Sequence, residues 1–316
     1  MAKFTINLPD VSKLVPLILF LSLITNLIFV IILVPSLLSQ FRSTSNKSTT
    51  STATTSKDNI FDQINPTSGF EINATYGDLG PKMVALGVID QKKFESTYQN
   101  SNQPLTADQE KILTQGSDQK IKITSDNSYF LLNFFWAVGL ANKSNILSQG
   151  DMVKYGGQGG AGNFASTGGW TLAKSSAMNY YSKSPLISLT PDQEKLVENV
   201  SSNIYRPCCD NPTSFPDCNH GMALLGILEL MASQGASEAD MYNAAKYINA
   251  FWFPGNYSDL ALYFKNKEGK SFKDIDAKTI LSKDYSSATG YQNKKQWLTQ
   301  NGVVETPAKQ GGGCGV

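Results

Sequence analysis

Residues 221–234 read Gly-Met-Ala-Leu-Leu-Gly-Ile-Leu-Glu-Leu-Met-Ala-Ser-Gln, and this stretch decides the fold. It predicts a strongly apolar helix that ends at Gly235, a residue suited to the left-handed conformation after a helix. Residues 129–140, Tyr-Phe-Leu-Leu-Asn-Phe-Phe-Trp-Ala-Val-Gly-Leu, are apolar on nearly every side. Twelve residues are too few to cross a bilayer, so this second helix belongs in the core of a domain.

Most of the remaining chain outside the first sixty residues also has helical signals. Thr106 with Gln109, and Thr190 with Gln193, have the spacing of a capping box, and Ser237 precedes a further apolar-periodic stretch. Residues 171–181 predict one more helix, and residues 121–124 alternate as a brief extended piece. We therefore expect an all-α, mostly helical domain with long irregular glycine-rich and cysteine-rich loops.

The composition divides the chain into seven segments. These are an inner tail (1–13), a transmembrane anchor (14–38), a Ser/Thr-rich linker (39–60), a helical half (61–150), a glycine-rich loop (151–170), a second helical half that carries a cysteine cluster (171–310) and a Gly/Cys tail (311–316). The net charge is +1, from 27 basic and 26 acidic residues. This balance gives no reason to expect a nucleic-acid partner.

The anchor is predicted from residues 14–34, which contain no charged side chain. At about 1.5 Å per residue they reach about 30 Å, the thickness of one hydrocarbon core. No small-residue cleavage site follows, which favours an uncleaved anchor over a signal peptide. Ser/Thr-rich stalks are typical of domains held outside a cell, so we expect a single-pass protein of the cell membrane with an extracytoplasmic C-terminal domain.

Residues 207–222 contain most of the cysteine and histidine side chains of the protein. Three of the four cysteines, Cys208, Cys209 and Cys218, and the only histidine, His220, lie in this stretch. Thiolate sulfur and imidazole nitrogen are preferred ligands of Zn²⁺ and Cu(I). The cluster also precedes the apolar helix, whose unpaired amides and positive end favour thiolates. We therefore predict a zinc or copper site made by these four residues, with Cys314 in the C-terminal tail as a closing ligand.

Two other interpretations of the cysteines remain open at this point. Four cysteines outside a cell allow a disulfide-stapled structural or interaction domain, for instance with Cys208 or Cys209 bonded to Cys218 and the other to Cys314. Adjacent cysteines near a helix N-terminus also suit thiol–disulfide exchange. Cys218 and His220 are two residues apart and point in different directions, so we assign no catalytic pair.

The cluster and the helices after it resemble a known family. Pro207-Cys-Cys209, then Cys218 and His220, are followed by a helix and by residues 231–242, Met-Ala-Ser-Gln-Gly-Ala-Ser-Glu-Ala-Asp-Met-Tyr. This order is similar to that of the PCYCGC-motif proteins, although the Cys-x-Cys-x-Cys core is absent. The resemblance implies a membrane-anchored extracytoplasmic protein that binds metal and has no enzymatic activity. From the cluster and the anchor together we expect metal binding, transfer or sensing at the membrane surface, with a protein partner for metal exchange.

Overall fold

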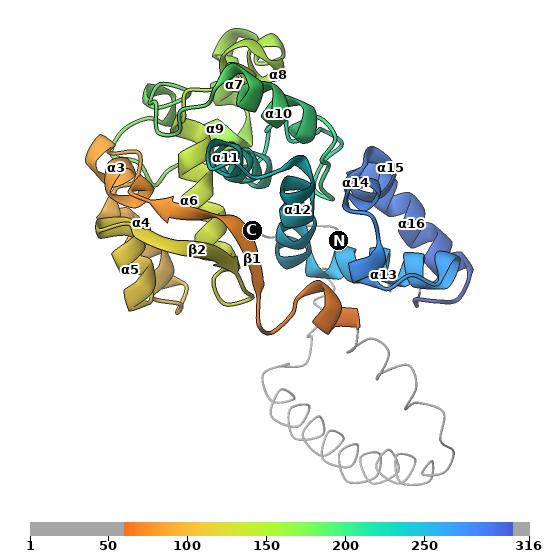
Figure 1. The fold of residues 1–316 in the computed structure, drawn as a ribbon. Coiled ribbons are helices and arrows are strands. Elements are labelled where there is room, and N and C mark those ends of the chain that lie inside the picture. The colour runs from red at the N-terminus through yellow and green to blue at the C-terminus, as the bar shows by residue number, and fades with distance from the viewer. Residues whose placement is uncertain (1–59, 306–316) are drawn as a thin grey trace, which may run out of the picture. The chain divides into compact units, whose positions relative to one another are not determined.

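The computed structural model describes residues 60–305, and most of them are helical (Figure 1). The strands are β1 (Phe70–Gly77) and β2 (Ser117–Ile123). The α-helices are α3 (Leu79–Leu86), α4 (Gln91–Asn100), α5 (Ala107–Thr114), α6 (Ser128–Ala141), α7 (Asn145–Gln149), α8 (Asp151–Lys154), α9 (Ala165–Gly168), α10 (Pro191–Ser201), α11 (Asn219–Ser233), α12 (Glu238–Trp252), α13 (Pro254–Glu268), α14 (Ala277–Leu281), α15 (Lys283–Ser286) and α16 (Ala288–Gln300). Short 3₁₀ turns are η2 (Gly157–Asn163), η3 (Ala177–Asn179) and η4 (Phe272–Asp274).

The predicted helical character is thus confirmed for this part of the chain. The inner tail, the transmembrane anchor, nearly all of the linker and the Gly/Cys tail with Cys314 lie outside the described residues. Within residues 60–305, no helix has both the length and the apolar character needed to cross a bilayer.

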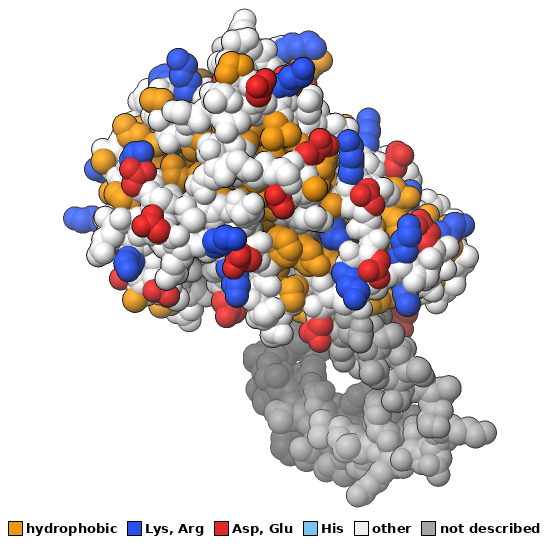
Figure 2. Space-filling model, viewed as in Figure 1, with side chains coloured by type: hydrophobic (Ala, Val, Ile, Leu, Met, Phe, Trp, Pro, Cys, Tyr) orange, Lys and Arg blue, Asp and Glu red, His pale blue; other side chains and the backbone are white. Residues whose placement is uncertain are grey.

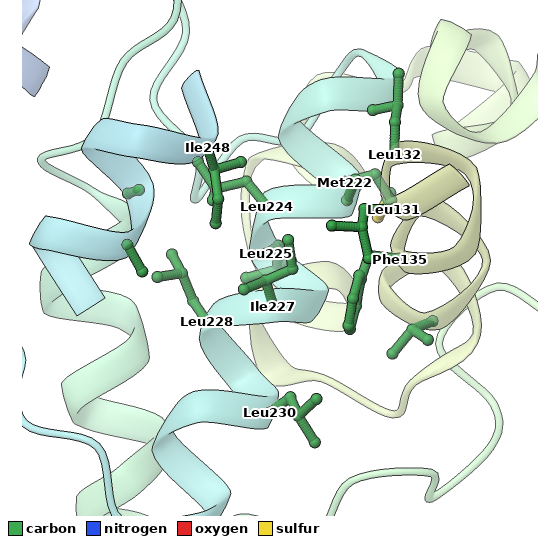
Figure 3. Close-up of a cluster of buried hydrophobic side chains, with 14 of the residues drawn as sticks. Leu131, Leu132, Phe135, Met222, Leu224, Leu225, Ile227, Leu228, Leu230 and Ile248 are labelled. Carbon is green, nitrogen blue, oxygen red and sulfur yellow. The ribbon is translucent and has the colours of Figure 1, made fainter. Parts of the chain in front are cut away.

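The core is built around the crossing of α6 and α11, the two helices predicted from their apolar sequences. Figure 3 shows α6 side chains such as Leu131 and Phe135 packed against α11, with Ile248 of α12 on the other side. The backbones approach closely where Gly139 meets α11. A Cβ at Gly139 would lie 2.1 Å from the carbonyl oxygen of Met222. Glycine is therefore required at this crossing, because any side chain would force the two helices apart.

The two strands form an antiparallel pair, and β1 packs against α6 and α12. The register places Phe70 opposite Ile123, and the inward ring of Tyr76 packs edge-on against Phe134. The extended piece expected at residues 121–124 is confirmed as the end of β2. Its partner β1 was not expected, because the pairing joins segments far apart in the sequence.

Local helix signals are confirmed at three positions. Thr106, Thr190 and Ser237 each accept a hydrogen bond from the third helical residue and complete a capping box. The helix predicted over residues 171–181 is wrong, since only the η3 turn forms there.

Backbone pairing with an earlier segment explains this failure. The amide of Lys174 donates to Gly87 O (2.9 Å), and the amide of Asp90 donates to Leu172 O (2.7 Å). These bonds satisfy the backbone outside a helix, so the local helical preference of residues 171–181 is overridden.

Candidate metal centre

The cysteines lie on the loop that connects α10 to α11. The loop folds back on its own start, because the Thr213 amide donates to Ile204 O (2.8 Å) and the Thr213 hydroxyl donates to the same oxygen (3.0 Å). Its outer part is attached to α16, where the amide of Ala288 donates to Cys209 O (2.9 Å). The loop therefore has a defined shape set by contacts with α16 and with its own start.

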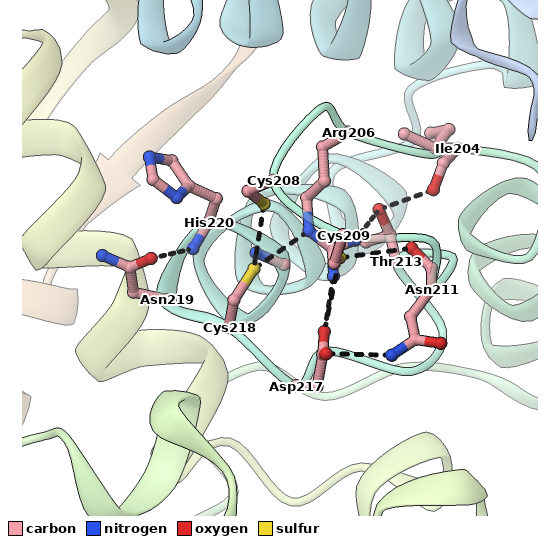
Figure 4. Close-up of polar contacts among 11 residues, drawn as sticks. Ile204, Arg206, Cys208, Cys209, Asn211, Thr213, Asp217, Cys218, Asn219 and His220 are labelled. Atoms are coloured by element: carbon pink, nitrogen blue, oxygen red, sulfur yellow. Dashed lines mark hydrogen bonds and ion pairs between the residues drawn. The ribbon is translucent and has the colours of Figure 1, made fainter. Parts of the chain in front are cut away.

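This shape brings three of the predicted ligands together. The sulfur atoms of Cys208, Cys209 and Cys218 all lie within 4.8 Å of one another (Figure 4). The Sγ atoms of Cys208 and Cys218 are 3.5 Å apart. All three are free cysteines; Cys208 is exposed, and the other two are half-buried. The cluster is therefore open to the surface on the Cys208 side.

The fully buried side chain of Arg206 packs next to the cluster and donates hydrogen bonds to it. The guanidinium of Arg206 donates from Nε to Cys218 Sγ (3.1 Å), from Nη1 to Thr213 Oγ1 (3.4 Å) and from Nη2 to Asp217 Oδ1 (3.0 Å). Gly221 leaves the room for it, because a Cβ there would lie 2.6 Å from Arg206 Cζ. These hydrogen bonds fix the guanidinium group, and with it one positive charge, next to the sulfur atoms.

Cys218 is the residue most strongly favoured as a thiolate. It is the N-cap of α11, where its sulfur accepts from the Gly221 amide (3.4 Å). Hydrogen bonds from the thiols of Cys208 and Cys209, together with the charge of Arg206, lower the pKa of Cys218 well below its usual value. The pKa of Cys208 is raised by its hydrogen bonds with the other two cysteines. The surroundings thus favour a thiolate at Cys218 over one at Cys208.

His220 does not belong to the group of converging sulfur atoms. Its ring packs against Trp252 (centroids 5.5 Å apart), the last residue of α12, and against Phe253 (4.5 Å), which follows it. The ring remains next to the thiol of Cys218. A hydrogen bond with His220 is the smallest of the effects that lower the pKa of Cys218. Figure 4 shows the ring on the opposite side of the cluster from Cys209. The structure therefore brings three of the four neighbouring candidates together and sets the histidine to one side.

Arg206 and Asp217 were not predicted from the sequence as part of the site. Each immediately precedes a segment that carries a cysteine, and Arg206 is one of only two arginines among the 27 basic residues. An arginine next to Pro207-Cys208-Cys209 in a chain that otherwise uses lysine was the available signal. Arg is preferred over Lys at buried ion pairs because its planar group makes several fixed hydrogen bonds.

Comparisons with known proteins do not identify the chain. No protein-family model, no curated protein and no solved structure matches it. Across residues 60–305, the three cysteines form the one group of Cys, His, Asp or Glu side chains close enough to hold a metal ion. A functional assignment therefore depends on the geometry of this cluster.

Proposed function

We propose that this protein binds one soft metal ion, Zn²⁺ or Cu(I), through Cys208, Cys209 and Cys218. The observation that carries the proposal is the convergence of three sulfur atoms within 4.8 Å. Sulfur ligands at about 2.3 Å from a tetrahedral zinc ion are ~3.8 Å apart. The cluster reaches this geometry with shifts of about 1 Å or less, whereas a disulfide requires sulfur atoms to approach to about 2.05 Å.

The charges around the cluster support a cation at its centre. Three thiolates next to the carboxylate of Asp217 would repel one another in a half-buried site. Arg206 offsets only one of these four negative charges, and a bound Zn²⁺ or Cu(I) ion would offset two or one more. A metal ion also lets Cys208 and Cys209 lose their protons, which neither does readily in its absence because the pKa of each is raised.

The exposed position of Cys208 supports exchange of the ion with a partner. A structural zinc site is closed by four ligands and is shielded from solvent. Here one ligand reaches the surface, and a fourth ligand would come from His220 or from Cys314. We therefore propose metal binding and transfer at the outer surface of the cell membrane, with the domain held there by the predicted anchor at residues 14–38.

Metal analysis of the full chain tests the proposal. Protein purified under reducing, anaerobic conditions should contain about one equivalent of zinc or copper. Replacement with Co²⁺ should give the sulfur-to-cobalt charge-transfer absorption of a thiolate site. Cys208→Ser, Cys209→Ser and Cys218→Ser should each lose the metal.

Two further variants identify the fourth ligand. His220→Ala or Cys314→Ser should weaken binding if the corresponding side chain completes the site, and the variant that leaves binding unchanged serves as the matched control. Absence of metal, together with a Cys208–Cys218 disulfide in mass mapping of unreduced protein, would contradict the proposal. That result would favour the disulfide-stapled domain or the thiol–disulfide protein.

A further inference from the structure

The three sulfur atoms of the cluster have no fourth ligand converging with them. Among residues 60–305, the Cys, His, Asp and Glu ligand atoms that lie within 4.8 Å of one another are those of Cys208, Cys209 and Cys218. The ring of His220 packs on aromatic side chains instead. Zinc prefers four ligands in a tetrahedron. In ligand number, the cluster is therefore better matched to an ion that three sulfur atoms complete.

The charges around the sulfur atoms indicate the charge of that ion. The charged residues of the loop between α10 and α11 are Arg206, Asp210 and Asp217. Asp210 is turned to α16, where its carboxylate accepts from the amide and the hydroxyl of Thr289 (2.8 Å each). Arg206 and Asp217 form an ion pair (3.0 Å) and balance each other. Three thiolates would then leave three negative charges, which a trivalent ion offsets fully and Zn²⁺ or Cu(I) only in part.

Trivalent arsenic and antimony combine both properties. Each forms three bonds and keeps a lone pair, so its complex with three thiolates is a pyramid that needs no fourth ligand and has no net charge. Both are soft and therefore favour thiolate sulfur. The bonds of such a pyramid enclose narrower angles than those of a tetrahedron. Accordingly, Cys208 Sγ and Cys218 Sγ are 3.5 Å apart, closer than the ~3.8 Å of a tetrahedral zinc site.

We propose that the cysteine cluster captures trivalent arsenic or antimony, taken up as the trihydroxide. This inference rests on the proposed function, because it uses the same three sulfur atoms as ligands of one ion. In the reaction with arsenite, each As–O bond is replaced by an As–S bond to Cys208, Cys209 or Cys218. Each hydroxide leaves as water, with the proton of a thiol or, at a thiolate, with a proton from the solvent. Arsenic remains trivalent, so no oxidant or reductant is needed.

Access to the cluster suits an uncharged molecule. Cys208 is exposed, so its thiol is available for the first exchange, and the half-buried Cys209 and Cys218 complete the reaction. Arsenite is uncharged As(OH)₃ at neutral pH. The net charge of the chain is +1, and basic and acidic side chains are interspersed on the face drawn in Figure 2. That face therefore has no extended field of one sign that would favour a charged ligand.

Thiol counting on the reduced, metal-free full chain tests the proposal, with sodium arsenite as the probe. One equivalent should remove three of the four thiols, and the mass should rise by one arsenic atom less three hydrogen atoms. Cys208→Ser, Cys209→Ser and Cys218→Ser should each weaken arsenite binding at least about tenfold. Serine is a favoured N-cap, so Cys218→Ser retains the cap of α11. Sodium arsenate, whose arsenic is pentavalent, is the matched control probe and should remove no thiol.

A chain with both His220→Ala and Cys314→Ser separates this inference from the proposed zinc or copper site. It lacks both candidate fourth ligands, so its zinc affinity should fall at least about tenfold. One equivalent of arsenite should still remove three thiols, because the pyramid takes no fourth ligand. Removal of two thiols or none, in this variant or in the native chain, would overturn the inference.

The two proposals can fail separately. A native chain that holds zinc or copper but does not give up three thiols to arsenite would retain the proposed function and refute the arsenic site. A native chain that gives up three thiols to arsenite but holds neither zinc nor copper would support the arsenic site and exclude those two metals.

Discussion

Replacing Glu229 with glutamine should change how the stability of this protein depends on pH. The carboxyl group is completely buried in the core face of α11, and its pKa is raised from 4.5 to about 7, chiefly by burial. Between these two pH values the folded protein keeps a proton that the unfolded chain has released. Stability therefore decreases as pH rises through this window, and the full loss is present above pH 7.

The size of this loss follows from the two pKa values. A difference from 4.5 to about 7 amounts to about 3 kcal/mol, at about 1.4 kcal/mol for each pH unit. Glutamine has the same shape as protonated glutamate and can still accept from Asn142. Because it does not ionise, the variant lacks this loss. Relative to the native chain, Glu229→Gln should gain about 3 kcal/mol in unfolding free energy between pH 4.5 and pH 8.

Urea unfolding at pH 5, 6, 7 and 8 measures the effect. The quantity of interest is the difference in unfolding free energy between variant and native chain at each pH, since all other titrating groups cancel in it. Glu110→Gln on the exposed face of α5 is the matched control and should give a constant difference. A constant difference for Glu229→Gln as well would refute the assignment of a buried, titrating carboxyl group.

Other substitutions test the helix crossing, a helix cap and the role of Arg206 in the proposed metal site. Gly139→Ala should destabilise the fold by about 3 kcal/mol in urea unfolding, since its Cβ would lie 2.1 Å from a carbonyl oxygen of α11. Gly255→Ala, where nothing lies within 4 Å, should leave stability unchanged or raise it by up to about 1 kcal/mol; equal effects at both positions would contradict the close crossing. Thr190→Ala should cost about 1 kcal/mol through loss of the cap of α10, and no change would show that the capping box contributes little. Arg206→Met should weaken zinc binding about tenfold or more in a competition titration, because Cys218 loses its cationic neighbour; unchanged affinity would remove Arg206 from the site.

Local signals in the sequence predict much of the helical structure. The capping residues Thr106, Thr190 and Ser237 act within one turn of their own helices, so their role does not depend on the rest of the fold. The apolar helices now seen as α6 and α11 are recognisable because almost every side of each is buried. The convergence of Cys208, Cys209 and Cys218 was predicted from their closeness in the chain.

Contacts between distant segments decided what local signals did not reveal. Strand β1 forms because β2 lies beside it. The start of residues 171–181 stays non-helical because the carbonyl of Leu172 and the amide of Lys174 pair with Asp90 and Gly87. His220 is close to the cysteines in sequence, yet its ring packs against Trp252 at the end of α12 and against Phe253 after it. In each case a tertiary contact was stronger than the preference of the local sequence.

The sequence by itself determined where the apolar helices lie and that three cysteines lie close together, because both depend on neighbours a few positions away. Only the tertiary structure decided that Arg206 is buried next to the sulfur atoms and that Glu229 is completely buried in the core. A charged side chain in a sequence does not reveal what will surround it. Its surroundings are set when helices such as α6, α10 and α11 pack together, and with them its pKa and the ligands it can bind.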